Sequence, residues 1–202
     1  MKFLHAWFLI CFAWVAALQG ASKSLYEKGG GCAPDERVLY KKAFSKKEKL
    51  AEELHLEFFY PDGFAKTDSR PSIVFFFGGG WTGGDTSQFY AQAKYLASRG
   101  MLAICAQYRR ALKTAKPVWC VEDARSGVRY LRKHASALGL DPKRIAAGGG
   151  SAGGHLAAAT ATISAFDWPD DDLTVSAVPN ALVLFNPVFD NSPKGYGHDR
   201  LG

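Results

Sequence analysis

CxxC motifs, internal repeats and low-complexity segments are all missing from this sequence of 202 residues. Its four cysteines form no CxxC pair, and its five histidines complete no zinc-binding pattern. A strong excess of one charge is missing too, because 25 Lys and Arg against 19 Asp and Glu give a net charge of only +6. These absences argue against a structural zinc site, a repeat protein and a nucleic-acid-binding protein, and nothing implies a metal or organic cofactor.

The densest basic stretch, residues 41–49, holds five lysines. A patch for nucleic acid or an anionic surface is one interpretation of such a run. Basic and aromatic residues do not interleave here as they do in an RNA-binding sheet. We therefore interpret the stretch as the solvated face of a hairpin.

Long apolar runs are scarce, and the longest, residues 6–18, lies close to the amino terminus. It follows Lys2 and His5 and is too short for a comfortable membrane span. Small residues suited to cleavage come next, at Ala16, Ala17, Gly20, Ala21 and Ser22. The pattern predicts a signal peptide over residues 1–21 and a secreted or periplasmic protein with no stable membrane span after cleavage. A retained N-terminal anchor is the alternative.

Signal removal would take away Cys11 and leave three cysteines, Cys32, Cys105 and Cys120. Export permits disulfide formation, but three is an odd number. At least one thiol is therefore free or paired with a group outside this chain, and the pairing stays open. Cys105 falls in an apolar segment, which is typical of a buried, inert thiol.

The order of the predicted elements indicates the fold class. Two segments that favour a hairpin come first, and strands then alternate with amphipathic helices, which predicts an α/β protein. Its sheet is expected to be mostly parallel with antiparallel N-terminal strands. The predicted strands cover residues 36–40, 55–60, 73–77, 101–107, 144–147 and 181–185, and the predicted helices cover 87–98, 117–138 and 152–164. An acidic loop is expected over 166–180.

The strongest chemical signal is a G-x-S-x-G motif centred on Ser151. A short predicted strand precedes it and a predicted helix follows, which is the context of a nucleophile elbow. A serine on such a tight turn stands clear of the sheet, while small flanking residues let the strand and the helix pass closely. The N–H of Ala152, at the helix start, is then placed to donate to an oxyanion.

The second signal is a glycine run, Gly78-Gly79-Gly80-Trp81, at the end of a buried predicted strand. Glycines there let backbone N–H groups face a ligand with no side chain in the way, as an oxyanion loop requires. A plain glycine turn is the alternative.

Both glycine runs also match G-x-G-x-x-G, the pattern of a dinucleotide-binding turn. That fold needs an acidic residue at the end of the next strand. After the first run the next predicted strand ends at Gln107-Tyr108-Arg109, which contains no acidic residue. After the second run a helix and a loop come before the next predicted strand. Nucleotide binding is therefore not favoured.

Together these motifs resemble the α/β-hydrolase fold, in the hormone-sensitive-lipase-like group of esterases and its secreted bacterial relatives. The resemblance covers residues 37–190 and implies a three-layer α/β-hydrolase sandwich within a domain of residues 22–202. Arg109 and Asp123 match positions that tie together the loops below the site. The matching segments are Gly78-Gly79-Gly80-Trp81, Tyr108-Arg109, Glu122-Asp123-Ala124, Gly139-Leu140-Asp141-Pro142-Lys143-Arg144-Ile145 and Gly150-Ser151-Ala152-Gly153-Gly154-His155.

The resemblance implies a catalytic role for Ser151 as the nucleophile and an oxyanion hole formed by Gly79, Gly80 and Ala152. One position departs from the family pattern, because Phe77 stands where the family usually has a histidine. That histidine braces the oxyanion loop and transfers no proton. A phenylalanine is expected to brace the loop by packing instead.

The acid and the base of a triad are not evident. In this fold they follow the serine in the order acid, then histidine, whereas only one predicted strand follows Ser151. His155 matches a structural position of the family. Asp190 and His198 are the remaining candidate pair, although the usual place for the base is absent.

The sequence thus resembles a hydrolase whose last strands are missing. Residues 181–185 would then form an unpaired apolar sheet edge. A serine without its base is a poor nucleophile, so we expect this polypeptide alone to be weakly active or inactive.

The function expected for the full gene product is that of a secreted serine hydrolase. Its substrates would be small-molecule or carbohydrate esters with short acyl chains, acetyl groups on plant polysaccharide being one case. A serine peptidase of the same fold is one alternative, although its usual propeller repeats are absent. A truncated, non-catalytic binding protein is the other.

Overall fold

The computed structural model describes residues 32–45, 50–111, 117–196 and 198. The chain divides into two units, Met1–Ala33 and Pro34–Gly202, and the architecture below is that of the second. The predicted signal peptide lies outside the described residues. None of the described helices is long and apolar enough to cross a membrane.

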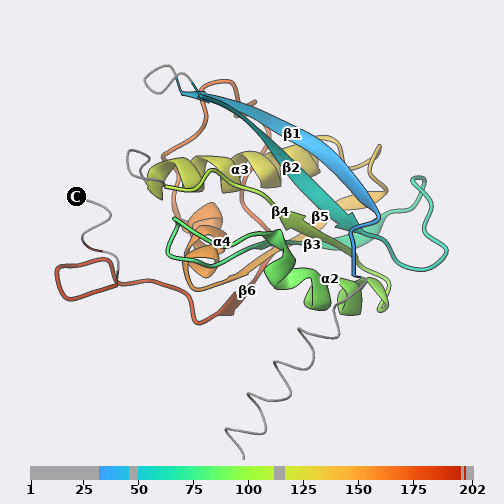
Figure 1. Cartoon of the computed structure of the whole chain (residues 1–202). Helices are drawn as coiled ribbons and strands as arrows, with labels where there is room; N and C mark the ends of the chain where they lie inside the picture. The colour runs from blue at the N-terminus through green and yellow to red at the C-terminus, as the bar shows by residue number, and fades with distance from the viewer. Residues whose placement is uncertain (1–31, 46–49, 112–116, 197, 199–202) are drawn as a thin grey trace, which may run out of the picture. The chain divides into compact units, whose positions relative to one another are not determined.

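One mixed sheet forms the centre of the second unit (Figure 1). Within the described residues it has six strands in the order β1-β2-β4-β3-β5-β6. The β2 strand runs antiparallel to both of its neighbours, and the pairs from β4 to β6 are parallel, so the predicted sheet is confirmed. The strands are β1 (Glu36–Ser45), β2 (Leu50–Phe59), β3 (Arg70–Phe76), β4 (Leu102–Ala106), β5 (Leu140–Gly150) and β6 (Ala181–Phe185).

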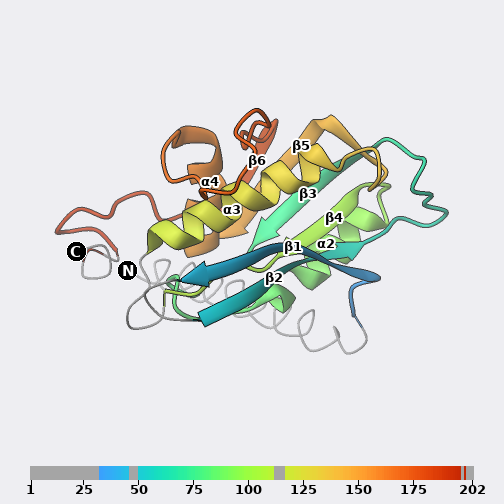
Figure 2. The same cartoon turned by 90° about the horizontal axis from the view of Figure 1, so that it is seen from above.

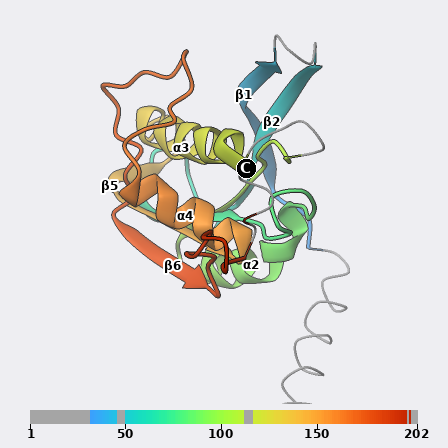
Figure 3. The same ribbon diagram turned by 90° about the vertical axis from the view of Figure 1, so that its left-hand side faces the viewer.

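Helices cover both faces of this sheet and complete the predicted three layers. A 3-10 turn, η1 (Thr86–Phe89), leads into α2 (Tyr90–Ala97) on one face. The other face carries α3 (Pro117–Lys133) and α4 (Ala152–Thr162), which lie side by side (Figures 2 and 3).

The core follows from two apolar patterns in the sequence. Strands β3 and β4 are continuous apolar runs because both of their faces are covered, and Leu102–Ala106 is buried at every position. Helix α3 buries a stripe with steps of three and four residues, which packs on the sheet. The stripe consists of Val121, Ala124, Val128 and Leu131.

Most predicted boundaries differ from the structure by one to five residues, and three of the differences are described here. Helix α3 ends at Lys133, five residues before the predicted end at 138, and successive turns continue as far as Gly139. These turns still bury Ala135 and Leu138, so apolar spacing alone did not reveal the helix end. Strand β5 begins at Leu140 rather than at residue 144, because Leu140 pairs with Arg70. The predicted helix over 87–98 begins as a 3-10 turn.

The interpretation of residues 41–49 as a solvated face is wrong at Lys41. This side chain is buried and forms an ion pair with Asp123, whereas the neighbouring Lys42 is exposed beside Glu53. Strand alternation causes the difference, because successive side chains point to opposite faces of the sheet. The lysines at 46, 47 and 49 lie outside the described residues.

Strand β6 stands at the end of the sheet order, next to β5. Its apolar side chains are partly exposed, and Leu182, Val183 and Phe185 keep 38–46% of their surface. Within the described residues, the apolar sheet edge expected over 181–185 is present.

Candidate active site

Ser151 lies at the turn between β5 and α4, in a backbone conformation that disfavours any side chain. Its φ is 54° and its ψ is −119°. Left-handed φ values at non-glycine residues cost about 1–3 kcal/mol and are held only where the surrounding structure enforces them. The predicted elbow is therefore present as a strained turn at the carboxyl end of a central strand.

Glycines around Ser151 permit this turn, because strand, turn and helix pack without side chains between them. A Cβ at Gly149 would lie 2.4 Å from the carbonyl oxygen of Gly153. A Cβ at Gly153 would lie 2.0 Å from the carbonyl oxygen of Phe76. The helix therefore approaches the end of β3 as well as that of β5, and it brings the two glycine motifs together.

The glycine loop after β3 lies directly beside the serine. A Cβ at Gly78 would lie 3.3 Å from the Cβ of Ser151. Three successive residues then have positive φ values, 131° at Gly79, 60° at Gly80 and 63° at Trp81. The chain turns sharply here, which explains the glycines at 79 and 80.

Hydrogen bonds fix the shape of this loop. The carbonyl of Gly79 accepts from the N–H groups of Thr82 and Gly83, at 3.2 and 3.0 Å. Ala152 is the first residue of α4, where backbone N–H groups have no acceptor within the helix. The predicted oxyanion donors Gly79, Gly80 and Ala152 thus lie on two segments that meet at Ser151, and their role stays a prediction.

Phe77 packs against the loop where the family usually has a histidine. Its ring stacks on that of Tyr108, with centroids 4.1 Å apart. The Tyr108 hydroxyl donates to the carbonyl of Phe77 over 2.7 Å. Burial raises the pKa of this hydroxyl, so it remains a donor. A stacked aromatic pair therefore braces the loop.

Gln88 is a loop contact that the sequence did not reveal. Its Oε1 accepts from the N–H of Gly78 over 2.6 Å. This contact occupies the first N–H of the glycine loop, next to Ser151. A polar residue in a predicted helix gave no signal of it, because the contact depends on how η1 folds back over β3.

The described histidines after Ser151 are engaged elsewhere. His155 accepts from the indole N–H of Trp81, and the ring of His198 contacts the carbonyl of Asn191. The carboxylate of Asp190 accepts from the backbone N–H of Ser192. Within the described residues, the candidate pair Asp190 and His198 is therefore not joined to Ser151.

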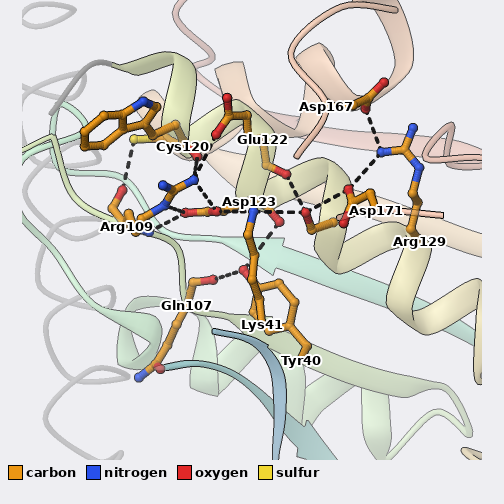
Figure 4. A network of polar contacts seen from close by, with 12 residues as sticks. Tyr40, Lys41, Gln107, Arg109, Cys120, Glu122, Asp123, Arg129, Asp167 and Asp171 are labelled. Atoms are coloured by element: carbon orange, nitrogen blue, oxygen red, sulfur yellow. Dashed lines mark hydrogen bonds and ion pairs between the residues drawn. The ribbon is translucent and has the colours of Figure 1, made fainter. Parts of the chain in front are cut away.

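A buried ion cluster is centred on Asp123 (Figure 4). Both oxygens of Asp123 accept from Arg109, at 2.8 Å each, and Lys41 approaches Asp123 to 2.7 Å. The Trp168 ring packs over both cations, 4.3 Å from Lys41 Nζ and 4.9 Å from Arg109 Cζ. Arg109 and Asp123 therefore tie β1, α3 and two loops together, as the resemblance implied.

Cys120 lies beside this cluster. Its thiol donates to the carbonyl of Arg109 over 3.1 Å, and burial raises its pKa. The thiol is therefore protonated and unreactive at neutral pH.

The acidic loop that follows α4 is anchored by arginines of α3. Asp167 forms ion pairs with Arg125 and Arg129, each at 2.6 Å, and Asp171 forms one with Arg129 at 3.2 Å. Burial alone would raise the pKa of Asp167, but hydrogen bonds and charges from Arg125 and Arg129 outweigh it and lower the pKa. The available sequence signal was the spacing of four residues between Arg125 and Arg129, which places both side chains on the same face of a helix.

A strained serine at a strand–helix turn, a glycine loop beside it and this strand order define the α/β-hydrolase class. A family model described as BD-FAE matches residues 56–188, most of the described domain. The chain belongs to this BD-FAE family.

Similar proteins include esterases. Carboxylesterase NlhH of Mycobacterium tuberculosis is 33% identical over 99 residues, 48% of this chain and 30% of the relative. Esterase 2 of Thermogutta terrifontis phosphoramylated by tabun is 43% identical, with a TM-score of 0.74 over 83% of this chain and 61% of that structure. Its propionate-bound form is 41% identical, with a TM-score of 0.75 over 85% of this chain and 64% of that structure. The match therefore spans less than two thirds of each.

Proposed function

We propose that the protein is a carboxylic ester hydrolase with Ser151 as its nucleophile. The observation that carries this proposal is the strained Ser151 turn, set beside the glycine loop at the end of β3. Esterases among the relatives support it, and one of them is phosphoramylated by tabun, a reaction that needs a nucleophile.

In the proposed reaction Ser151 Oγ forms a bond to the ester carbonyl carbon. The hydroxyl proton passes to a general base, and the carbonyl oxygen becomes an oxyanion held by the N–H groups of Gly79, Gly80 and Ala152. The C–O bond to the alcohol breaks, and the base returns the proton to that alcohol. Water then hydrolyses the acyl-enzyme by the same steps and restores the serine.

Short acyl groups are the proposed substrates. The propionate-bound form of the Thermogutta esterase supports this range. The N-terminal sequence supports export, and acetyl groups on carbohydrate are substrates that an exported esterase meets. Amino-terminal sequencing of the exported protein should give a start close to residue 22, and retention of residues 1–21 would contradict this part.

The test uses the product of the whole open reading frame, after sequencing of the source DNA across the codon for Gly202. We expect hydrolysis of p-nitrophenyl acetate, propionate and butyrate, with slower hydrolysis of octanoate and of matched anilides. Ser151→Ala should reduce kcat by about 10⁴-fold or more, with an unchanged unfolding midpoint. Faster cleavage of the anilides would indicate a peptidase.

A second measurement tests the intermediate. Mass spectrometry after brief exposure to a tabun-like phosphorylating agent should locate the added group on Ser151 and find none in Ser151→Ala. Ligand binding without turnover, unaltered by Ser151→Ala, would contradict the proposal and indicate a binding protein.

A further inference from the structure

One side chain connects the helix of the serine with the glycine loop. The indole Nε1–H of Trp81 donates to Nδ1 of His155 over 3.3 Å, and the two rings meet edge to face, with an interplanar angle of 89°. One turn earlier in the same helix, the carbonyl of Ser151 accepts from the backbone N–H of His155 over 3.0 Å. His155 therefore contacts the nucleophile residue through its backbone and the glycine loop through its ring.

The contact determines the state of the imidazole ring. An indole N–H is a donor only, so Nδ1 of His155 has to be unprotonated and the ring proton has to be on Nε2. Burial lowers the pKa of His155 below its ordinary value, which keeps the ring neutral at pH 7. With its acceptor nitrogen occupied by the indole, this histidine is not available to take the proton of Ser151.

Trp81 transmits this contact to the loop backbone. The residue is completely buried and has a left-handed φ of 63°, directly after the two glycines proposed as oxyanion donors. Its carbonyl accepts from the N–H of Ala111 over 2.6 Å, so the backbone is held on one side and the indole on the other. A shift of the indole would therefore alter the direction of the N–H groups of Gly79 and Gly80.

We propose that His155 is a positioning residue, which holds the oxyanion loop in register with Ser151 by accepting the indole N–H of Trp81. This inference rests on the proposed function. The oxyanion forms only after Ser151 attacks and is absent from the bound ester, so a misplaced loop lowers kcat and leaves substrate binding nearly unchanged.

Two substitutions at one position separate this role from simple packing. His155→Leu removes the acceptor and keeps an apolar side chain of similar reach, whereas His155→Asn places Oδ1 where Nδ1 stood. In the product of the whole reading frame, His155→Leu should lower kcat for p-nitrophenyl acetate about 10- to 100-fold with KM within twofold. His155→Asn should recover most of that loss.

Equal kcat losses in the Leu and Asn variants would overturn the proposal, and so would a His155→Leu enzyme with kcat within twofold of the parent. Trp81→Phe provides a second route if His155→Leu does not fold. It should lower kcat in the same way, and adding His155→Ala, which removes the acceptor, should cause no further loss. An additive loss would show that His155 acts independently of Trp81.

An NMR measurement decides the contact without using activity. In protein with ¹⁵N-labelled histidine at pH 7, the His155 signals, assigned by their loss in His155→Asn, should show the proton on Nε2. Trp81→Phe should shift the Nδ1 resonance, because its hydrogen-bond donor is gone. A proton on Nδ1, or an Nδ1 resonance that ignores Trp81→Phe, would overturn the proposal. Because no ester is involved, failure of the proposed function would leave this result intact.

Discussion

The serine turn and the ion cluster are two closely packed regions that are held together by different kinds of contact. Around Ser151 the close contacts are between backbone segments, and a Cβ at Gly149 or Gly153 would clash with a carbonyl. Around Asp123 the contacts are between long charged side chains that come from β1, from α3 and from the loop before it. The first region therefore depends on small residues, and the second depends on charge balance.

The difference predicts how each region fails. An added methyl group damages the serine turn, because backbone cannot move aside cheaply. In the ion cluster, size matters less than the loss of one sign of charge, since a buried charge without a partner is costly.

The largest effect is expected from breaking the cluster at its centre. Asp123→Ala would leave Lys41 and Arg109 buried without their shared carboxylate, and we expect a loss of about 3–5 kcal/mol in the free energy of unfolding. Glu53→Ala, which removes the partner of the exposed Lys42, should change it by less than about 1 kcal/mol. Urea denaturation of both variants measures the contrast, and similar losses would refute it.

The next effect concerns the serine turn. Alanine in place of a helical glycine normally stabilises by about 1 kcal/mol, but at Gly153 the new Cβ would lie 2.0 Å from the Phe76 carbonyl oxygen. We expect Gly153→Ala to destabilise by about 1–3 kcal/mol and to abolish activity. Gly83→Ala is the control, because its nearest neighbour would be 3.7 Å away. Thermal unfolding and ester hydrolysis measure both effects. An unfolding midpoint and an activity close to those of the parent would show that the turn can relax around the new methyl group.

A smaller effect tests the strain at Ser151 itself. Glycine relieves a left-handed φ worth about 1–3 kcal/mol and loses about 0.4–1 kcal/mol through the freer unfolded chain. Ser151→Gly should therefore be about 1 kcal/mol more stable than Ser151→Ala, which keeps the Cβ at the same φ of 54°. Denaturant titration of these two variants gives the difference, and a less stable glycine variant would show that the turn is not strained.

The smallest effect is a change in acid sensitivity. The pKa of Asp167 is lower in the folded protein than its ordinary value of 3.8, so the unfolded chain binds the proton more readily. Its stabilising contribution is complete above about pH 4 and is lost as the pH falls through the lower, folded pKa. Between pH 5 and pH 3 the free energy of unfolding of Asp167→Asn should thus fall by less than that of the parent. Equal losses in urea titrations at the two pH values would argue against this ion pair.

Local chemistry explains why the serine turn was predictable. Glycine and serine patterns report backbone conformations directly, so the elbow at Ser151 and the loop at residues 78–81 were located from the sequence. The six strands and their order of appearance followed from apolar runs and periodicity, and only the element ends were misplaced. At residues 134–138 the spacing of buried residues continues through turns, which a periodic pattern cannot distinguish from helix.

The side-chain contacts between distant elements were not predictable. Lys41 and Lys42 are consecutive residues of the same type, yet Lys41 is buried against Asp123 and Lys42 is exposed, because β1 presents them to opposite faces. The contact of Gln88 with the N–H of Gly78 spans 10 residues, and that of His155 with the indole of Trp81 spans 74. Both depend on how separate elements pack together.

The sequence by itself determined the class of fold, the place of the strained serine turn and the glycine loop, because these depend on which residues tolerate a given backbone. Only the tertiary structure decided which charges are buried, which face of β1 meets α3 and which side chains hold the loop. Those outcomes depend on the packing of helices on the sheet, where segments 74 residues apart, such as Trp81 and His155, come into contact.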